Sequence, residues 1–226
     1  MGVQLPRWVW VGAGALACIA GMVNVVGYLG FEHQAITHLT GTTSLLGAAL
    51  ADGDAGSGLR LSGMILAFMA GAAISGLIIQ DSALYLGRRY GVVLMLESLL
   101  LFASIGLFKH QQIAGALLAA MACGLQNAMA TTYSGAVVRT THLSGMFTDL
   151  GIGLGHALRG MPLPRRRLML SSLIIALFAT GGVIGAALFR RFAYDALLVP
   201  ATLTGLVGFG YVGYRQWRLA HPRAQA

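Results

Sequence analysis

The sequence predicts an all-α integral membrane protein with six transmembrane helices and two short helices that enter the membrane without crossing it. Of its 226 residues, 57% are hydrophobic and only 10% are charged, and the mean hydropathy is +0.75. Soluble domains carry roughly 25% charged residues, so the composition excludes that class. An internal duplication further predicts one membrane domain (1–226) built from two repeat units, about 8–108 and 112–217.

Six apolar runs approach or reach the length of about 20 residues that a helix needs to cross a bilayer. They lie at about 8–30, 61–80, 91–108, 113–130, 168–189 and 196–214. Two shorter runs, 39–51 and 143–158, follow the first span of each unit. The first has only 13 residues, which make about 20 Å of helix, against a hydrocarbon core of roughly 30 Å. We therefore expect these two helices to be re-entrant or partly inserted.

The duplication is clearest in the short runs. THLTGTTSLLGAAL (37–50) and THLSGMFTDLGIGL (141–154) are identical at seven of fourteen positions. GMVN (21–24) pairs with GLQN (124–127), and FMAGAAI (68–74) pairs with FATGGVI (178–184), in the same order along the chain. Because three spans is an odd number, the second unit is inverted relative to the first, as a 3+3 repeat.

The alternative is eight spans, in which the short runs also cross and the repeat is a parallel 4+4. Arg and Lys concentrate on the cytoplasmic side of membrane proteins, and both arrangements place the N-terminus and the C-terminus there. The matching pairs Arg88–Arg89 and Arg190–Arg191 fall on opposite sides in the inverted arrangement, which favours eight spans. The length of the short runs favours six.

The short runs also hold most of the expected binding residues, because shortened helices at matching places of two repeats point to a transporter's binding site. Thr40 and Ser144 are good N-cap residues, and a helix N-terminus suits a carboxylate or a phosphate. Packed turns, in which Gly41 and Gly145 allow close helix approach, are the alternative interpretation. The candidate substrate-binding residues are Asn24, His38, Thr40, Gly41, Thr43, Gln126, Asn127, His142, Ser144, Gly145 and Thr148.

Asn24 and Asn127 occupy matching places in the first span of each unit, and Gln126 is adjacent to the second. Polar side chains in hydrocarbon usually hydrogen-bond between helices, so the pair either joins helices or flanks a central ligand cavity. Both interpretations place these side chains inside the bundle.

Glu97 and Asp149 are the acidic candidates for proton coupling. Glu97 lies inside a span, where ionisable residues are functional by default; a side chain that reaches the interface is the alternative. Asp149 lies in the second short run, where Arg139 or His142 is the expected partner. Since histidine is the side chain suited to proton transfer at neutral pH, His38 and His142 are further candidates.

Other classes of function lack support in the sequence. There is no P-loop, HExxH, GxSxG or dinucleotide fingerprint, so we expect no enzyme, no catalytic residues and no cofactor. Cys18 and Cys123 stand alone in apolar runs, and no Cys/His cluster predicts a metal. The net charge of +8 comes from Arg residues between apolar runs, which argues against nucleic acid as a partner.

Four segments resemble the YoaK family of bacterial multi-spanning membrane proteins, a group of unknown function. They are GMVNVVGYLGF, HLTGTTSLLG, GLQNA and FMAGAAISG, and the resemblance extends over about residues 12–214. It implies a multi-pass protein of the bacterial inner membrane. The chain departs from the family pattern at Asn24, commonly an acid, and at Thr42, commonly Asn in a Thr-Gly-Asn motif.

We therefore expect a small-molecule secondary transporter or permease with its site between the two short helices. Its expected partners are the lipid bilayer and a small, anionic solute. A channel, or a membrane scaffold or assembly subunit without a substrate, is the alternative. The spacings Gly71…Ser75 and Gly181…Gly185 permit tight helix packing, either within the chain or in a homo-oligomer.

Overall fold

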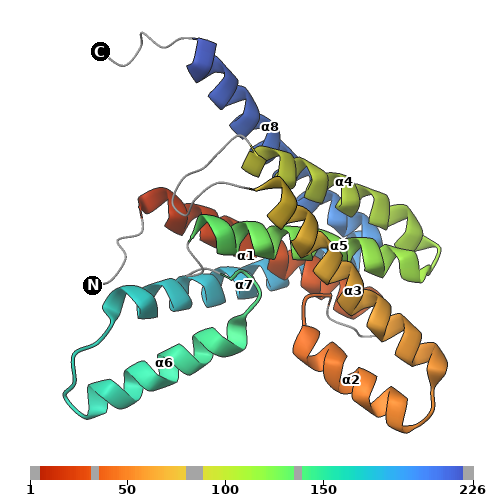
Figure 1. Cartoon of the computed structure of the whole chain (residues 1–226), viewed down its shortest axis with the longest axis horizontal. Coiled ribbons are helices and arrows are strands. Elements are labelled where there is room, and N and C mark those ends of the chain that lie inside the picture. Colours follow the sequence, from red (N-terminus) through yellow and green to blue (C-terminus); the bar gives the residue numbers. More distant parts are fainter. Residues whose placement is uncertain (1–5, 32–35, 80–88, 135–138, 221–226) are drawn as a thin grey trace.

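The computed structural model describes residues 6–31, 36–79, 89–134 and 139–220, and these are helical almost throughout (Figure 1). The elements are α1 (Arg7–Gly30), α2 (Leu39–Ala51), α3 (Ala55–Ile78), α4 (Arg89–Lys109), α5 (Ile113–Tyr133), α6 (Leu143–Leu158), α7 (Arg165–Phe192), the 3-10 turn η1 (Ala193–Leu197) and α8 (Leu198–Ala220). No strand occurs in the described ranges. Both short helices have the predicted bounds.

Five helical stretches within the described residues are long and apolar enough to cross a membrane. They are Trp8–Gly30, Ala55–Ile78, Arg89–Lys109, Ile113–Tyr133 and Arg165–Gly213. The last one contains α7, η1 and most of α8, and α2 is a shorter apolar helix. Large apolar side chains cover the outside of the helices, among them Leu59 and Leu77 at 78% and 76% exposure. Such a surface suits lipid, so the chain is a helical membrane protein.

Two pairs of parallel helices make the most extensive contacts, α1 with α7 and α3 with α5. In these pairs α1 and α5 are mostly buried, whereas α3 and α7 lie further out. The paired backbones touch at glycines. A Cβ atom on Gly71 of α3 would lie 2.0 Å from the carbonyl oxygen of Met121 in α5, and one on Gly181 of α7 would lie 2.0 Å from that of Cys18 in α1. The predicted small-residue spacings are therefore used within the chain.

Glycines of α5 and α1 lie equally close to the backbones of α3 and α7. A Cβ on Gly124 would lie 2.0 Å from the carbonyl oxygen of Phe68, and one on Gly21 would lie 2.1 Å from that of Phe178. These four residues belong to the duplicated segments GMVN, GLQN, FMAG and FATG. The first long helix of each predicted repeat unit thus packs against the second long helix of the other, through residues at matching places in the sequence.

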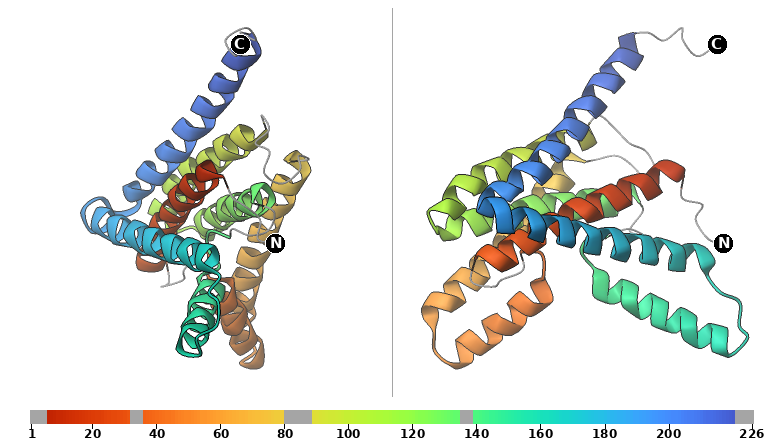
Figure 2. Two further views of the ribbon diagram at one scale, coloured as in Figure 1. Left: turned by 90° about the vertical axis from the view of Figure 1, so that its left-hand side faces the viewer. Right: turned by 180° about the vertical axis from the view of Figure 1, so that it is seen from behind.

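The helix α4 runs antiparallel to α8. Near one end, Gly91 of α4 meets Gly208 of α8; near the middle, the Ser98 hydroxyl donates to the carbonyl oxygen of Ala201 over 2.7 Å. Along the long axis of the molecule, α1, α4 and α7 therefore run one way and α3, α5 and α8 the other (Figures 1 and 2).

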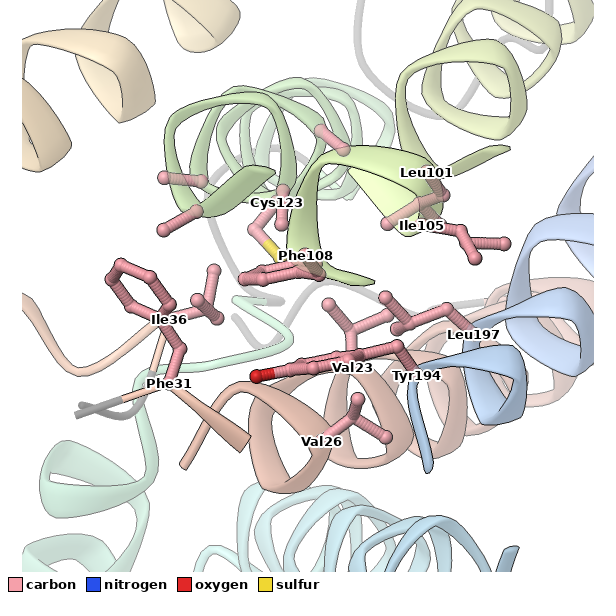
Figure 3. Packing of buried hydrophobic residues seen from close by; sticks show 14 of the residues in the cluster. Val23, Val26, Phe31, Ile36, Leu101, Ile105, Phe108, Cys123, Tyr194 and Leu197 are labelled. Atoms are coloured by element: carbon pink, nitrogen blue, oxygen red, sulfur yellow. The ribbon is translucent and has the colours of Figure 1, made fainter. Parts of the chain in front are cut away.

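Aromatic residues join the end of α4 to the turn before α8 (Figure 3). The rings of Phe108 and Tyr194 stack with centroids 5.1 Å apart, and the Tyr194 hydroxyl donates to the carbonyl oxygen of Gly30 at the end of α1. Beside them, Lys109 forms an ion pair with Asp195 at 2.6 Å. These contacts hold α1, α4 and η1 together at this end of the bundle.

The short helices protrude from the bundle as hairpins, α2 against α3 and α6 against α7 (Figures 1 and 2). Both begin near the middle of the long axis and run outward in opposite directions (Figure 1). The two hairpin tips consequently lie at opposite ends of the molecule. The α2–α3 tip carries Asp52 and Asp54, whereas Arg159, Arg165 and Arg166 surround the α6–α7 tip.

Candidate functional site

Asn24 of α1 fixes the chain just before α2. Its Oδ1 accepts two hydrogen bonds from Thr37, one from the backbone N–H at 2.9 Å and one from the hydroxyl at 2.8 Å. Thr37 is only 7% exposed, so water does not readily replace this acceptor. The amide therefore sets the position from which α2 departs.

Asn127 of α5 fixes the chain before α6 in the same manner. Its Oδ1 accepts from the Thr140 hydroxyl at 3.1 Å, and its Nδ2 donates to the Thr141 hydroxyl. Asn24 and Asn127 thus hold the segments that precede the short helices and do not bond to each other. The sequence predicted the matching asparagines but missed their partners. Thr37 and Thr141 open the duplicated THL segment, which was the available signal; Thr140 has no such signal.

The expected N-caps, Thr40 and Ser144, are wrong. The helices begin at Leu39 and Leu143, so the N-cap residues are His38 and His142, and neither side chain makes a capping hydrogen bond. In α3, by contrast, the Asp54 carboxylate accepts from the Ser57 N–H at 3.0 Å. The first turns of α2 and α6 therefore keep N–H groups that no N-cap side chain occupies.

The glycines of the TG and SG motifs make room for these histidines. A Cβ on Gly41 would lie 2.3 Å from Cδ2 of His38, and one on Gly145 would lie 2.6 Å from Cδ2 of His142. The expectation that Gly41 and Gly145 admit a neighbouring helix is thus wrong, because each faces the imidazole one turn earlier. Both imidazoles lie over the first turn of their helix.

The hydroxyl groups of the short helices are exposed. Thr40, Thr43, Ser144 and Thr148 all lie on the outer surface of their helices. The Thr43 hydroxyl donates to the carbonyl oxygen of Leu39 at 2.8 Å, and the Thr148 hydroxyl to that of Ser144 at 2.9 Å. Bonds of this kind satisfy a hydroxyl without a second helix. The structure gathers these residues at the starts of two separate helices, without contact between the two sets.

Glu97 lies deep in the bundle, at 2% exposure, so the alternative of a side chain that reaches the interface is wrong. Its Oε1 accepts from the Gln126 amide at 2.9 Å, and its Oε2 has no hydrogen-bond partner among the described residues. The Thr140 hydroxyl lies 3.2 Å from Gln126 Oε1. A continuous polar chain therefore runs from Glu97 through Gln126 and Thr140 to Asn127.

A family model described as "Protein of unknown function (DUF1275)" matches residues 12–210. The chain belongs to this family. The resemblance to the YoaK group is thereby confirmed. No curated protein and no solved structure shows a significant match.

Asp149 of this DUF1275 protein pairs with neither of its expected partners, Arg139 and His142. It forms a two-point ion pair with Arg167, in which Nε and Nη2 lie 2.8 Å and 2.7 Å from the carboxylate oxygens. The pair joins the middle of α6 to the start of α7. Sequence spacing did not indicate it, because the partners are 18 residues apart on two helices of a hairpin.

Within the described part of the DUF1275 chain, no group of three or more His, Cys, Asp or Glu side chains is placed to hold a metal ion. Cys18 and Cys123 are both free thiols. The polar side chains of the bundle are mainly amides and hydroxyls, with Glu97 as the buried acid. This composition is suited to hydrogen-bonded recognition and proton binding.

Proposed function

We propose that this DUF1275 protein is a small-molecule secondary transporter of the bacterial inner membrane. The observation that carries the proposal is the placement of α2 and α6. Each short helix is fixed at its start by an asparagine of a central helix, and the two run outward from the middle of the molecule in opposite directions. Shortened helices that start near the middle of two repeat units are typical of transporter binding sites.

The alternating directions of the long helices support six spans arranged as an inverted 3+3 repeat. If α2 and α6 also crossed, α4 and α8 would run in the same direction, yet they are antiparallel. The charges of the hairpin tips support the same arrangement, with the basic α6–α7 tip and both termini in the cytoplasm. The acidic α2–α3 tip then faces the other side.

An anionic solute fits the first turns of α2 and α6. Their N–H groups lack a side-chain cap, and the positive ends of both helix dipoles point toward the middle of the molecule. The exposed His38, Thr40, His142 and Ser144 surround these ends and are able to donate hydrogen bonds to a carboxylate or a phosphate. The proposed site consists of these two first turns and the side chains around them.

The coupling group in this proposal is Glu97. Both carboxylate oxygens of Asp149 are engaged by Arg167. Glu97 is buried and has a free carboxylate oxygen among the described residues, as a group that takes up and releases a proton requires.

A thermal-shift screen of the purified full-length protein tests the proposal. Ligand binding raises stability by RT ln(1 + [L]/Kd), about 2.7 kcal/mol at a hundredfold excess over Kd. We expect stabilisation by small carboxylates or phosphates and none by neutral or cationic compounds of similar size. Thr40→Val and Ser144→Ala should reduce the shift, and Ser44→Ala, one turn further along α2 on an exposed face, should not.

The matching transport measurement is uptake of the stabilising solute into vesicles. Equal uptake by Thr40→Val, Ser144→Ala and the parent chain would place the site elsewhere. If no small anion stabilises well-folded protein, the transporter proposal is wrong. The hypothesis of a membrane scaffold without a substrate then explains the structure better.

A further inference from the structure

Glu97 stands where an ionised carboxylate is unfavourable. The side chain is 2% exposed, and its one polar contact within the described residues is the hydrogen bond from the Gln126 amide. Burial of a charge without a counter-charge is strongly disfavoured. A proton on the carboxylate removes this charge.

The described parts of the neighbouring elements offer no counter-charge. Helices α3, α5 and α8 and the turn η1 pack against α4, and none of their described residues forms an ion pair with Glu97. Asp195 of η1 pairs with Lys109 at the far end of α4. The ring of Tyr211, on α8, lies against Gly91, more than one turn from the acid.

The hydrogen bonds between Gln126, Thr140 and Asn127 can be made in two patterns, one for each protonation state of Glu97. Thr140 has one hydroxyl hydrogen and two acceptors within reach, Gln126 Oε1 at 3.2 Å and Asn127 Oδ1 at 3.1 Å. With Glu97 as acceptor, Gln126 donates its N–H to the carboxylate, and Thr140 shares its hydrogen between the two amides. With Glu97 as donor, the amide of Gln126 turns over, accepts from the acid and donates to Thr140, which then donates to Asn127 alone.

We propose that Glu97 is a proton-binding site, and that Gln126 and Thr140 are positioning residues that transmit its protonation state to the start of α6. One proton from solvent joins the carboxylate, and no other group changes charge. When Glu97 is protonated, Thr140 donates its hydrogen to Asn127 alone, which strengthens this hydrogen bond and stabilises the start of α6. Loss of the proton weakens the bond. The physiological meaning of this step, proton coupling, rests on the proposed transport function.

The first repeat unit supplies a built-in control. The residue equivalent to Gln126 in GMVN is Val23, and within the described ranges Asn24 accepts only from Thr37. In that part of the chain, the start of α2 therefore has the same kind of asparagine anchor but no link to an acid. A change that follows the protonation of Glu97 should appear at α6 and not at α2.

Hydrogen exchange of the full-length protein in nanodiscs tests the proposal without any solute. The measured quantity is the protection of amides 147–150 of α6, which bond within the helix, divided by that of amides 43–46 of α2; the division removes the general effect of pH on exchange. We expect this ratio to fall about threefold to tenfold from mildly acidic to alkaline pH, as for one hydrogen bond gained or lost. In Glu97→Gln, the ratio should be constant.

A constant ratio in the parent chain, or an unchanged pH dependence in Glu97→Gln, would overturn the proposal. Should Glu97→Gln fail to fold, Thr140→Val is the second variant, since it keeps the acid and removes the hydroxyl. There, the carboxylic C=O band in infrared difference spectra should still respond to pH while the ratio does not. A ratio that still follows pH in Thr140→Val would exclude the relay.

Thr37→Val is the matched control, with lower protection of α2 at every pH and an unchanged response of α6. The outcomes separate the two proposals. A pH-dependent ratio in a protein that no small anion stabilises keeps the proton site and rejects the transport function. Stabilisation by a small anion together with a constant protection ratio keeps the transport function and rejects the proton site.

Discussion

Asn24 and Asn127 occupy matching positions in the sequence but make different hydrogen bonds. Asn24 acts through one acceptor atom that receives two bonds from Thr37, whereas Asn127 both accepts from Thr140 and donates to Thr141. The backbone N–H of Thr37 is part of the first anchor. The Thr37 hydroxyl is therefore only one of the two groups that donate to Asn24.

We expect Asn24→Leu to destabilise the protein more than Thr37→Val does. The first change leaves a buried N–H and a buried O–H without their acceptor, and the second removes only the hydroxyl bond. Each unsatisfied group costs about 1–3 kcal/mol. Denaturant unfolding in detergent micelles measures the difference, and an equal loss in both variants would show that the backbone bond contributes nothing.

Sequence reasoning found the residues of the polar chain but not its connections. Glu97, Gln126 and Asn127 stand out because polar groups are rare in apolar runs. That Glu97 meets Gln126 depends on the rotation of α4 about its axis relative to α5, which is set by packing such as that of Gly115 against Phe108. A hydropathy pattern alone does not contain that rotation.

Among the elements, hydropathy located each helix, but it ended α8 at about 214 instead of Ala220 and began α3 too late. That helix begins at Ala55 instead of about 61, because Asp54 caps it and the first turn contains Gly56, Ser57 and Gly58. Capping extends a helix beyond its apolar part. The short helices were placed correctly since their apolar runs coincide with their hydrogen-bonded lengths.

The contribution of the glycine contacts to stability is tested by comparing two neighbouring glycines, one in contact with another helix and one in open space. A Cβ on Gly181 would lie 2.0 Å from the Cys18 carbonyl oxygen, whereas one on Gly182 meets nothing within 4 Å. We expect Gly181→Ala to force α1 and α7 apart and cost about 1–3 kcal/mol. Gly182→Ala should cause no loss, because alanine favours a helix.

The equivalent pair in the other half is Gly71→Ala, expected to be destabilising, with Gly76→Ala as its harmless control. Thermal unfolding of the four variants in one detergent measures the set. If Gly181→Ala and Gly71→Ala both match their controls, the close contacts of α1 with α7 and of α3 with α5 do not contribute to stability.

At the scale of the molecule, the crossed packing joins the two units. Because α1 packs on α7 and α5 on α3, neither predicted repeat unit contains both members of either pair. The duplication in the sequence suggested two units but not this exchange of partners, since periodicity records similarity between segments and carries no information on which segments touch. Only the duplicated glycines hinted at contact surfaces.

The helix contacts fix the relative directions of the long helices, whereas the side of the membrane that each hairpin tip occupies depends on the number of spans. In the six-span arrangement, the α2–α3 and α6–α7 tips face opposite sides; in the eight-span arrangement, both face the cytoplasm. Ala55→Cys and Met161→Cys place thiols at exposed positions of the two tips. Cys18 and Cys123 lie within α1 and α5, so the parent chain gives the background.

A membrane-impermeant maleimide applied to vesicles of each orientation should therefore label the two variants from opposite faces. We expect Met161→Cys to react only from the cytoplasmic face, because the arginines around that tip keep it there, and Ala55→Cys only from the other face. Reaction of both thiols from the cytoplasmic face would mean that α2 and α6 cross the bilayer. The antiparallel contact of α4 with α8 could not then coexist with eight alternating spans, so that result would overturn the arrangement of the helices along with the topology.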